Sequence, residues 1–179
     1  ASYDGSKTYE GHGYQTHIDL MKPTSRGGIQ LRSANPEEPP MILFNYLQTE
    51  EDQKVVIEGF KLARELLAQP AFDEFRDAEI DPGNDVKSDQ AILDWAKVNG
   101  ETEYHPTSSC SMGYSDSAVV DSELRVHGVA KLRVVDASIM PEIVTANTHA
   151  TTLMIAEKAS DFILGKPPLA PLSVPVFQK

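Results

Sequence analysis

Residues 121–141 read DSELRVHGVAKLRVVDASIMP and contain the most informative pattern in this chain. A short apolar run, Leu132 to Val135, stops at Asp136 and Ala137, and this pattern predicts a buried strand that ends in a turn. A carboxylate and small side chains at the carboxyl end of a buried strand leave room for a ligand. From the residues alone, a turn and a ligand contact are equal alternatives for Asp136.

Two polar segments flank this run, and each brings one side chain suited to chemistry. His105 lies in the upstream segment YHPTSSCSMG (104–113), where Pro106 favours an extended backbone and limits the directions of the imidazole. Histidine is the side chain best suited to accept a proton near neutral pH, although a lone histidine is more often packed in a loop. Asn147 begins the downstream segment NTHATT (147–152), where a helix N-cap and a cofactor contact are both compatible with it.

The composition excludes several classes of protein. The 179 residues carry a net charge of −11 and no two basic residues are adjacent, which argues against nucleic-acid binding. Cys110 is the only cysteine, so no internal disulfide can form, and a reducing compartment such as the cytoplasm is expected. The remaining histidines lack metal-ligand spacing, so no metal site is expected. The sequence also lacks a G-x-G-x-x-G phosphate loop.

Hydrophobic periodicity predicts a short antiparallel sheet followed by helices. Alternating side chains predict strands over residues 14–20, 29–32 and 41–46. Two helices are predicted to begin at the N-caps Thr49 and Ser88. A further strand is expected over residues 132–136 and a final helix over 147–164, which Gly165 ends.

Each predicted helix has an apolar stripe that is expected to face the core. The stripes consist of Val56, Phe60, Ala63 and Leu67 in the first helix, Ile92, Trp95 and Ala96 in the second, and Leu153, Ala156 and Ile163, interrupted by Ser160, in the third. The expected fold class is therefore α+β, with an antiparallel sheet and flanking helices followed by a strand and a helix. We expect one domain over residues 1–100, a second over 101–168 and a proline-rich tail over 169–179.

Several blocks in fixed order resemble the C-terminal portion of the glucose–methanol–choline (GMC) family of flavin-dependent oxidoreductases, and its bacterial choline dehydrogenase branch in particular. The main blocks are HPTSSCSMG (105–113), VVD (119–121), RVHG (125–128), LRVVDASIMP (132–141) and the segment from Asn147 to Lys158. Earlier stretches that resemble the same branch are SRGGIQLRSA (25–34), FNY (44–46) and AQPA (68–71).

The resemblance implies an FAD-dependent enzyme that oxidises a primary alcohol, choline to betaine aldehyde, by hydride transfer to the flavin. Residues 1–100 would then be part of the substrate-binding domain, and residues 101–168 would complete the FAD-binding domain. Because the family's phosphate loop and most of its cofactor site lie upstream, this chain is expected to be a fragment of a longer parent. By itself it is expected to lack dehydrogenase activity and to bind FAD weakly or not at all.

The resemblance also assigns roles to six residues. His105 matches the histidine that accepts the proton of the substrate hydroxyl, and Asn147 matches the residue that binds the alcohol oxygen. Asp136 and Ala137 match residues that contact the ribityl–phosphate region of the flavin. Thr148 and His149 match the stretch whose backbone faces its pyrimidine edge.

Two departures from the family pattern lie beside the implied active centre. They are the segment TSS (107–109) after His-Pro and the segment NTH (147–149). The alternatives are therefore a GMC dehydrogenase for another aliphatic or aromatic alcohol, and a non-catalytic stand-alone domain. The resemblance leaves the electron acceptor open, and it leaves the cytoplasm or the periphery of the inner membrane as the location of the parent enzyme.

Overall fold

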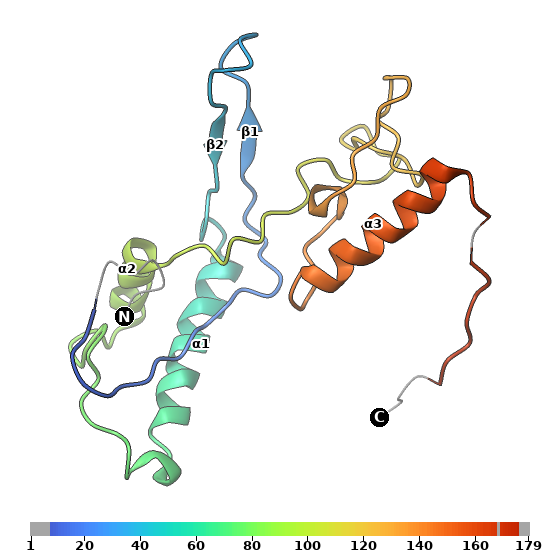
Figure 1. The fold of residues 1–179 in the computed structure, drawn as a ribbon. Coiled ribbons are helices and arrows are strands. Elements are labelled where there is room, and N and C mark those ends of the chain that lie inside the picture. Colours follow the sequence, from blue (N-terminus) through green and yellow to red (C-terminus); the bar gives the residue numbers. More distant parts are fainter. Residues whose placement is uncertain (1–7, 168, 176–179) are drawn as a thin grey trace. The chain divides into compact units, whose positions relative to one another are not determined.

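The computed structural model describes residues 8–167 and 169–175 and divides into two compact units, Ala1–His105 and Pro106–Lys179. The first unit contains strands β1 (Gly28–Gln30) and β2 (Met41–Leu43), helices α1 (Glu50–Leu67) and α2 (Asp89–Asn99), and the 3-10 helix η1 (Pro70–Phe72). The second unit contains the 3-10 helix η2 (Ala137–Ile139) and helix α3 (His149–Leu164) (Figure 1). Helices and an antiparallel sheet confirm the predicted α+β class.

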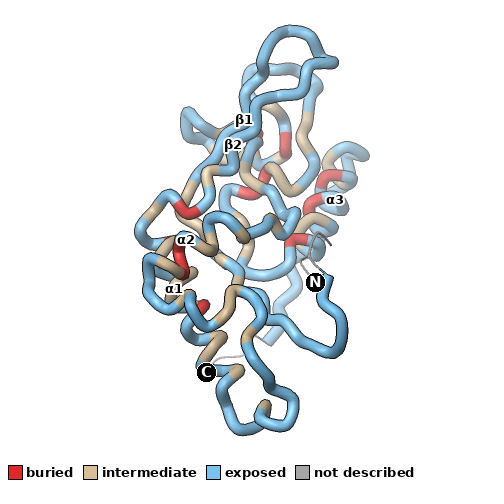
Figure 2. The backbone as a smooth tube through the Cα atoms, turned by 90° about the vertical axis from the view of Figure 1, so that its left-hand side faces the viewer, coloured by how far each residue is buried: buried red, intermediate tan, exposed pale blue. Residues whose placement is uncertain are grey.

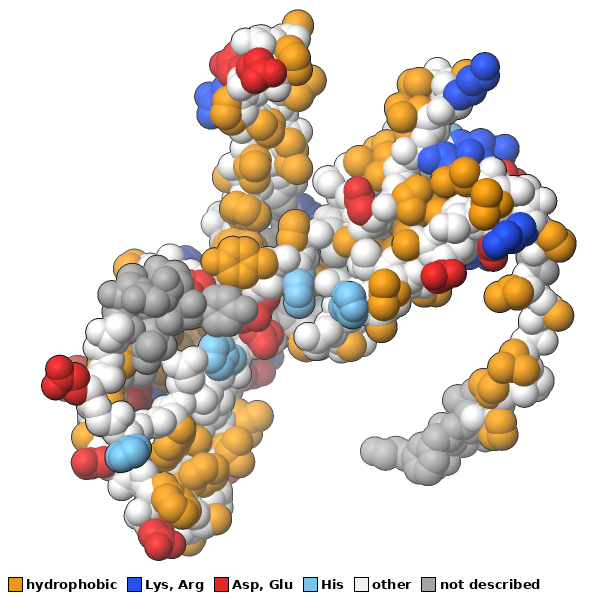
Figure 3. Space-filling model, in the orientation of Figure 1, with side chains coloured by type: hydrophobic (Ala, Val, Ile, Leu, Met, Phe, Trp, Pro, Cys, Tyr) orange, Lys and Arg blue, Asp and Glu red, His pale blue; other side chains and the backbone are white. Residues whose placement is uncertain are grey.

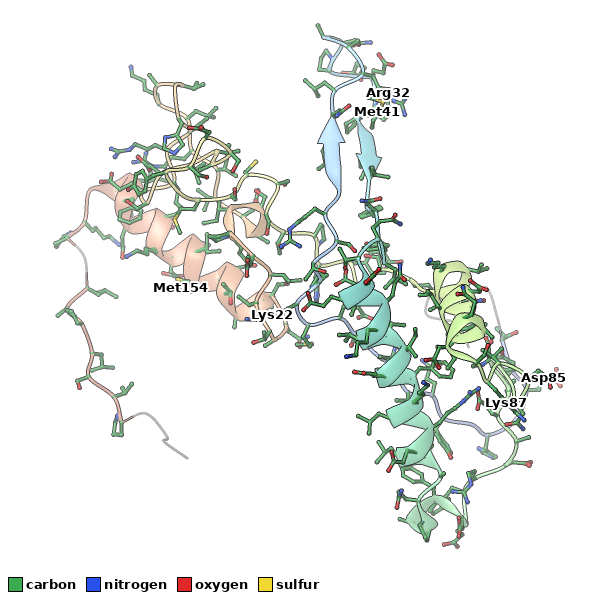
Figure 4. The ribbon with its side chains drawn as sticks, turned by 180° about the vertical axis from the view of Figure 1, so that it is seen from behind. Lys22, Arg32, Met41, Asp85, Lys87 and Met154 are labelled. Atoms are coloured by element: carbon green, nitrogen blue, oxygen red, sulfur yellow. The ribbon has the colours of Figure 1, made fainter. Side chains whose placement is uncertain are left out.

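Strands β1 and β2 form an antiparallel hairpin in which Ile29 pairs with Ile42. The guanidinium Nε of Arg32 donates to the carbonyl of Pro39 at 3.1 Å and joins the two arms beyond the ladder. Figure 4 labels Arg32 at this end of the hairpin. The predicted strands at 29–32 and 41–46 are thus present but shorter, and the second ends before Asn45, whose φ of 58° is incompatible with a strand.

The predicted strand over residues 14–20 is wrong, because this segment has no ladder partner and packs on α1 instead. A Cβ at position 59 would lie 2.7 Å from Cγ2 of Ile18, so the absence of a side chain at Gly59 permits the close approach. The ring of Tyr14 lies 5.8 Å from that of Phe72 in η1. The alternation of apolar and polar residues predicts that every second side chain is buried. A helix can bury those side chains as well as a second strand can.

Helices α1 and α2 begin and pack as predicted. The hydroxyl of Thr49 accepts the N–H of Asp52, and that of Ser88 accepts the N–H of Ala91, each at 3.2 Å. The predicted inward faces are confirmed, because Phe60 of α1 and Ile92 of α2 are buried. The Phe60 ring meets Trp95 edge-on, with ring centroids 5.8 Å apart.

Arg64 of α1 fastens the loop that leads into α2. Its guanidinium forms a bidentate ion pair with Glu79, in which Nε donates to Oε2 at 2.9 Å and Nη2 donates to Oε1 at 2.7 Å. The same group donates to the carbonyls of Val86 at 2.6 Å and Gly83 at 3.2 Å, and it stacks over the ring of Phe60. A single side chain therefore fixes a segment that has little regular structure.

The core of the second unit joins loops to one side of α3. It consists of Val120, Leu124, Ile139, Met140, Ile155 and Ala159. Figure 2 shows buried positions in red along α3. The predicted strand over 132–136 is wrong, since only Arg133 forms an isolated bridge, to Arg125. Around this bridge the N–H of Val126 donates to the carbonyl of Leu132 at 3.0 Å and that of Val134 to the carbonyl of Leu124 at 3.1 Å, so the pairing is confined to the short stretch between Lys131, whose φ is 63°, and the turn at Asp136.

Helix α3 begins at His149, two residues later than predicted, and ends as predicted at Gly165, whose φ is 65°. The inward face differs from the prediction. Ile155 and Ala159 are buried, whereas Leu153 and Ile163 are 54% and 60% exposed. The helix is apolar around most of its circumference, so periodicity alone did not identify the face that packs inside this chain.

Candidate functional site

Asp136 and Ala137 lie where the extended segment turns into η2. The Oδ1 atom of Asp136 accepts the N–H of Ser138 at 2.8 Å, so the carboxylate caps the first turn of η2. The Asp136 side chain is exposed and Ala137 is half-buried. The prediction that Asp136 forms a turn is therefore confirmed. Its contact with a ligand stays a prediction, with which its exposed carboxylate is compatible.

The polar segment that follows His105 is tied to the same 3-10 helix. The N–H of Cys110 donates to the carbonyl of Ser138 at 3.0 Å, and the N–H of Met112 donates to that of Ile139 at 2.8 Å. Two stretches that are distant in sequence thus lie side by side in the second unit. Cys110 itself is half-buried.

The start of α3 contacts this region, because η2 packs against α3. Thr148 is the N-cap residue and is buried, but its side chain makes no capping hydrogen bond. The predicted N-cap, Asn147, lies two residues before the helix, next to the actual N-cap, and is exposed. The first turn of α3 contains no acidic side chain, in contrast to α1, so its N–H groups favour an anionic or carbonyl group from elsewhere.

The structure thus gathers part of the predicted site within one unit. Asp136 and Ala137 of the η2 turn and Thr148 and His149 of the α3 start belong to elements in contact. His105 is exposed and is the last residue of the first unit. The pairing of His105 with Asn147 stays a prediction.

His127 has a role that the sequence did not reveal. Its Nε2–H donates to the carbonyl of Gly113 at 2.9 Å, and its backbone N–H donates to Val119 at 3.0 Å. The Tyr114 ring lies beside the imidazole, 6.3 Å away between centroids. His127 therefore fixes Gly113, the last residue of the polar segment 104–113, through this hydrogen bond. No local pattern indicates this, because the partner residues are distant in sequence.

Asp121 and Arg125 organise the loop that contains His127. The carboxylate of Asp121 accepts the Arg125 Nε–H at 2.9 Å and the backbone N–H groups of Glu123 and Arg125 at 2.8 Å and 3.0 Å. The hydrogen bond from the Arg125 backbone, above all, lowers the pKa of Asp121. A shallow hollow of about 520 Å³ follows this loop, and Figure 3 shows basic side chains gathered over this part of the second unit.

Within residues 8–167 and 169–175, the structure shows no cluster of three or more side chains able to hold a metal ion. In the same residues, no helix combines the length and the apolar character that crossing a bilayer requires. The hollow along the Asp121–Arg133 loop and a second one of about 300 Å³, which includes Glu50 and Asp89, contain none of the predicted site residues. A complete substrate cavity is therefore not formed by these hollows.

The order of these motifs and the fold around them define a class of protein. The sequence model of the GMC oxidoreductase family matches residues 23–156, and the chain belongs to that family.

Several curated relatives are similar over almost the whole chain. A protein of Pseudomonas putida named oxygen-dependent choline dehydrogenase is 51% identical over 168 residues, which cover 94% of this chain and 30% of the relative. A protein of the same name from Vibrio vulnificus is 50% identical over 171 residues, with the same coverage. The chain therefore spans about 30% of the length of these curated relatives.

Solved structures also resemble the chain. Pyridoxine 4-oxidase from Mesorbium loti superimposes with a TM-score of 0.76 at 30% identity, over 83% of this chain and 29% of that protein. A fungal aryl-alcohol oxidase gives a TM-score of 0.73 at 31% identity, over 82% of this chain and 24% of that protein. Both likenesses again involve less than a third of the longer protein.

Proposed function

We propose that this chain is the C-terminal part of an FAD-dependent dehydrogenase that oxidises choline to betaine aldehyde, and that it carries the catalytic pair of that enzyme. The observation that carries the proposal is the 51% identity, over 94% of this chain, to an oxygen-dependent choline dehydrogenase of Pseudomonas putida. Because the chain spans 30% of that relative, the rest of the parent enzyme supplies the phosphate loop and most of the cofactor site.

The second unit suits one part of a bound flavin. The N–H groups at the start of α3 would hold the electron-rich edge of a bound flavin, since neither a capping side chain nor an acidic residue competes for them. Asp136 adds an exposed carboxylate, and Ala137 a small side chain, for polar contacts near the ribityl chain. Residues 101–168 would thereby complete the FAD-binding domain, with residues 1–100 as part of the substrate-binding domain.

The two proposed catalytic side chains act on the same hydroxyl group of the alcohol in different ways. The His105 imidazole accepts the hydroxyl proton, because histidine is the side chain best suited to act as a general base near neutral pH. The Asn147 amide donates a hydrogen bond to the same oxygen and holds it as its negative charge grows. FAD supplies the acceptor for the hydride that leaves the α-carbon. We place the parent enzyme in the cytoplasm or at the periphery of the inner membrane.

A second candidate substrate is an aromatic alcohol. The aryl-alcohol oxidase and the pyridoxine 4-oxidase are both structural neighbours at about 30% identity. The departures at residues 107–109 and 147–149 lie beside the proposed catalytic residues, where substrate selection takes place. A non-catalytic domain is a third candidate, but the presence of both His105 and Asn147 counts against it.

The test is a steady-state assay of the full-length parent over a panel of alcohols with a dye acceptor. We expect choline to have the highest kcat/KM, with bound FAD bleached by choline in the absence of acceptor. A higher kcat/KM for an aromatic alcohol would support the second candidate instead. A full-length protein that binds no flavin and oxidises no alcohol would contradict both. The isolated 179-residue chain serves as the control and is expected to be inactive.

A further inference from the structure

His127 holds the far end of the polar segment 104–113, which contains His105. Its Nε2–H donates to the carbonyl of Gly113 at 2.9 Å. Because a carbonyl can only accept a hydrogen bond, the Nε2 atom must carry the hydrogen. Glycine has more backbone freedom than any other residue, so the carbonyl of Gly113 could point in several directions. The hydrogen bond from His127 selects one of them.

Backbone hydrogen bonds connect the same end of the segment to two neighbouring stretches. The N–H of Gly113 donates to the carbonyl of Val120 at 3.0 Å, and the N–H of Met112 donates to a carbonyl of η2 at 2.8 Å. His127 takes part through its backbone as well, because its own N–H donates to the carbonyl of Val119 at 3.0 Å. Residues 111–113 are therefore bonded both to η2 and to the stretch 119–127.

The position of His105 depends on this end of the segment. His105 is joined covalently to Pro106, the first residue of the second unit, and only residues 107–109 separate Pro106 from the bonded residues 110–113. A slip of residues 111–113 by one position along their partners would move the chain by about 3.3 Å. A catalytic group misplaced by about 1 Å can already lose 10²-fold in rate. Small changes at Gly113 can therefore affect the chemistry at His105.

We propose that His127 is a positioning residue for the oxidation of the alcohol, because it fixes the carbonyl of Gly113 and thereby sets the direction from which His105 reaches the substrate hydroxyl. This inference rests on the proposed function, in which His105 accepts the hydroxyl proton. His127 acts through the backbone and needs no contact with substrate or flavin. The competing explanation is that its ring only packs beside Tyr114, with ring centroids 6.3 Å apart.

Two variants of the full-length parent separate the hydrogen bond from the packing. His127→Gln places an amide N–H near the position of Nε2, whereas His127→Phe keeps an aromatic ring beside Tyr114 but cannot donate. We expect His127→Phe to slow flavin reduction by choline about tenfold or more and to change KM by less than about twofold. His127→Gln should restore most of the rate. Equal rates in the two variants, whether fast or slow, would overturn the proposal.

Tyr114→Phe is the matched control for these variants. It removes the 3.0 Å hydrogen bond between the hydroxyls of Tyr114 and Ser122, which joins the same two stretches of chain, and it leaves the carbonyl of Gly113 bonded to His127. We expect flavin reduction in Tyr114→Phe to be as fast as in the unaltered parent. A loss as large as that of His127→Phe would overturn the proposal, because general stiffening of the loop would then explain both effects.

Hydrogen exchange gives a readout that does not depend on turnover. The N–H of Gly113 is bonded to Val120, and the N–H of Val119 donates to the carbonyl of Ser111 at 2.9 Å. We expect both amides to exchange several-fold faster in the His127→Phe parent and normally in His127→Gln. Unchanged exchange in His127→Phe would overturn the proposal, and so would faster exchange without slower flavin reduction. A parent that oxidises no alcohol would refute the proposed function, while exchange would still show whether His127 fixes Gly113.

Discussion

The carboxylate of Asp52 holds the backbone of Thr24, 28 residues earlier in the chain, through a hydrogen bond of 2.7 Å. The same carboxylate accepts the Thr24 hydroxyl at 2.9 Å and the N–H of Ser25 at 2.8 Å. Asp52 is only 2% exposed. Burial raises its pKa, but hydrogen bonds from Ser25 and Thr24 together outweigh burial and lower the pKa to about 2. This contact joins the chain before β1 to the start of α1.

Replacing Asp52 with Asn is expected to lower the free energy of unfolding by about 1–3 kcal/mol, because an amide cannot accept all these hydrogen bonds and its own N–H groups would be buried. Urea unfolding of the chain, followed by circular dichroism, measures the change. Glu51→Gln is the matched control, since Glu51 lies in the same first turn but is exposed. Equal losses in both variants would show that the Thr24 contact contributes nothing.

Acid should destabilise the chain through the same carboxylate. The folded-state pKa of about 2 lies below the ordinary value of 3.8, so the folded state binds this proton less readily than the unfolded state. The stabilisation is therefore complete above pH 4 and is lost as the pH falls towards 2, by about 2 kcal/mol. Unfolding of the chain and of Asp52→Asn between pH 5 and pH 2 checks this. A parallel decline in both proteins would contradict the prediction.

Arg64→Lys should lower the free energy of unfolding by about 1–2 kcal/mol, because an ammonium cannot reproduce the planar pair with Glu79 together with the bonds to the carbonyls of Val86 and Gly83. Thermal unfolding of the chain and of the variant measures this change in stability. Lys54→Met is the control, since Lys54 pairs with Glu58 on an exposed surface where ion pairs contribute little. If Arg64→Lys unfolds like the unaltered chain, the loop over residues 79–86 is fixed by other contacts.

In the full-length parent, His105→Ala is expected to lower kcat by about 10² or more, as for loss of a general base. Rapid mixing with choline under anaerobic conditions measures the rate of flavin reduction directly. His12→Ala is a suitable control, because His12 is an exposed histidine of the first unit with no proposed role. An unchanged rate of flavin reduction in His105→Ala would remove this residue from the mechanism.

Local signals predicted the helices of the first unit well. Thr49 and Ser88 each act as N-caps through a hydrogen bond within one turn, and Phe60 and Ile92 face inward with helical spacing. Such features depend on neighbours three or four residues away, so the sequence contains all the information they need. The motif order was likewise sufficient to predict the family, which the match over residues 23–156 confirms.

Local sequence signals predicted only part of the candidate site. The sequence identified Asp136 and Ala137 beside a turn, and the capping bond to Ser138 is a local feature of that kind. It did not identify His127, whose partner Gly113 lies 14 residues away. The roles of His105 and Asn147 rest on the family resemblance and await the experiments described above.

Tertiary structure decided which apolar surfaces are covered. The alternating segment at 14–20 packs on α1 because Gly59 leaves space for Ile18, and α3 buries Ile155 instead of Leu153 because the loops of the second unit meet that side. Periodicity reports that a side chain is suited to burial, but the choice of partner depends on contacts between residues far apart in sequence. The sequence by itself therefore determined the family, the starts and inward faces of α1 and α2 and the candidate chemistry, whereas the tertiary structure decided the packing partners and the inward face of α3.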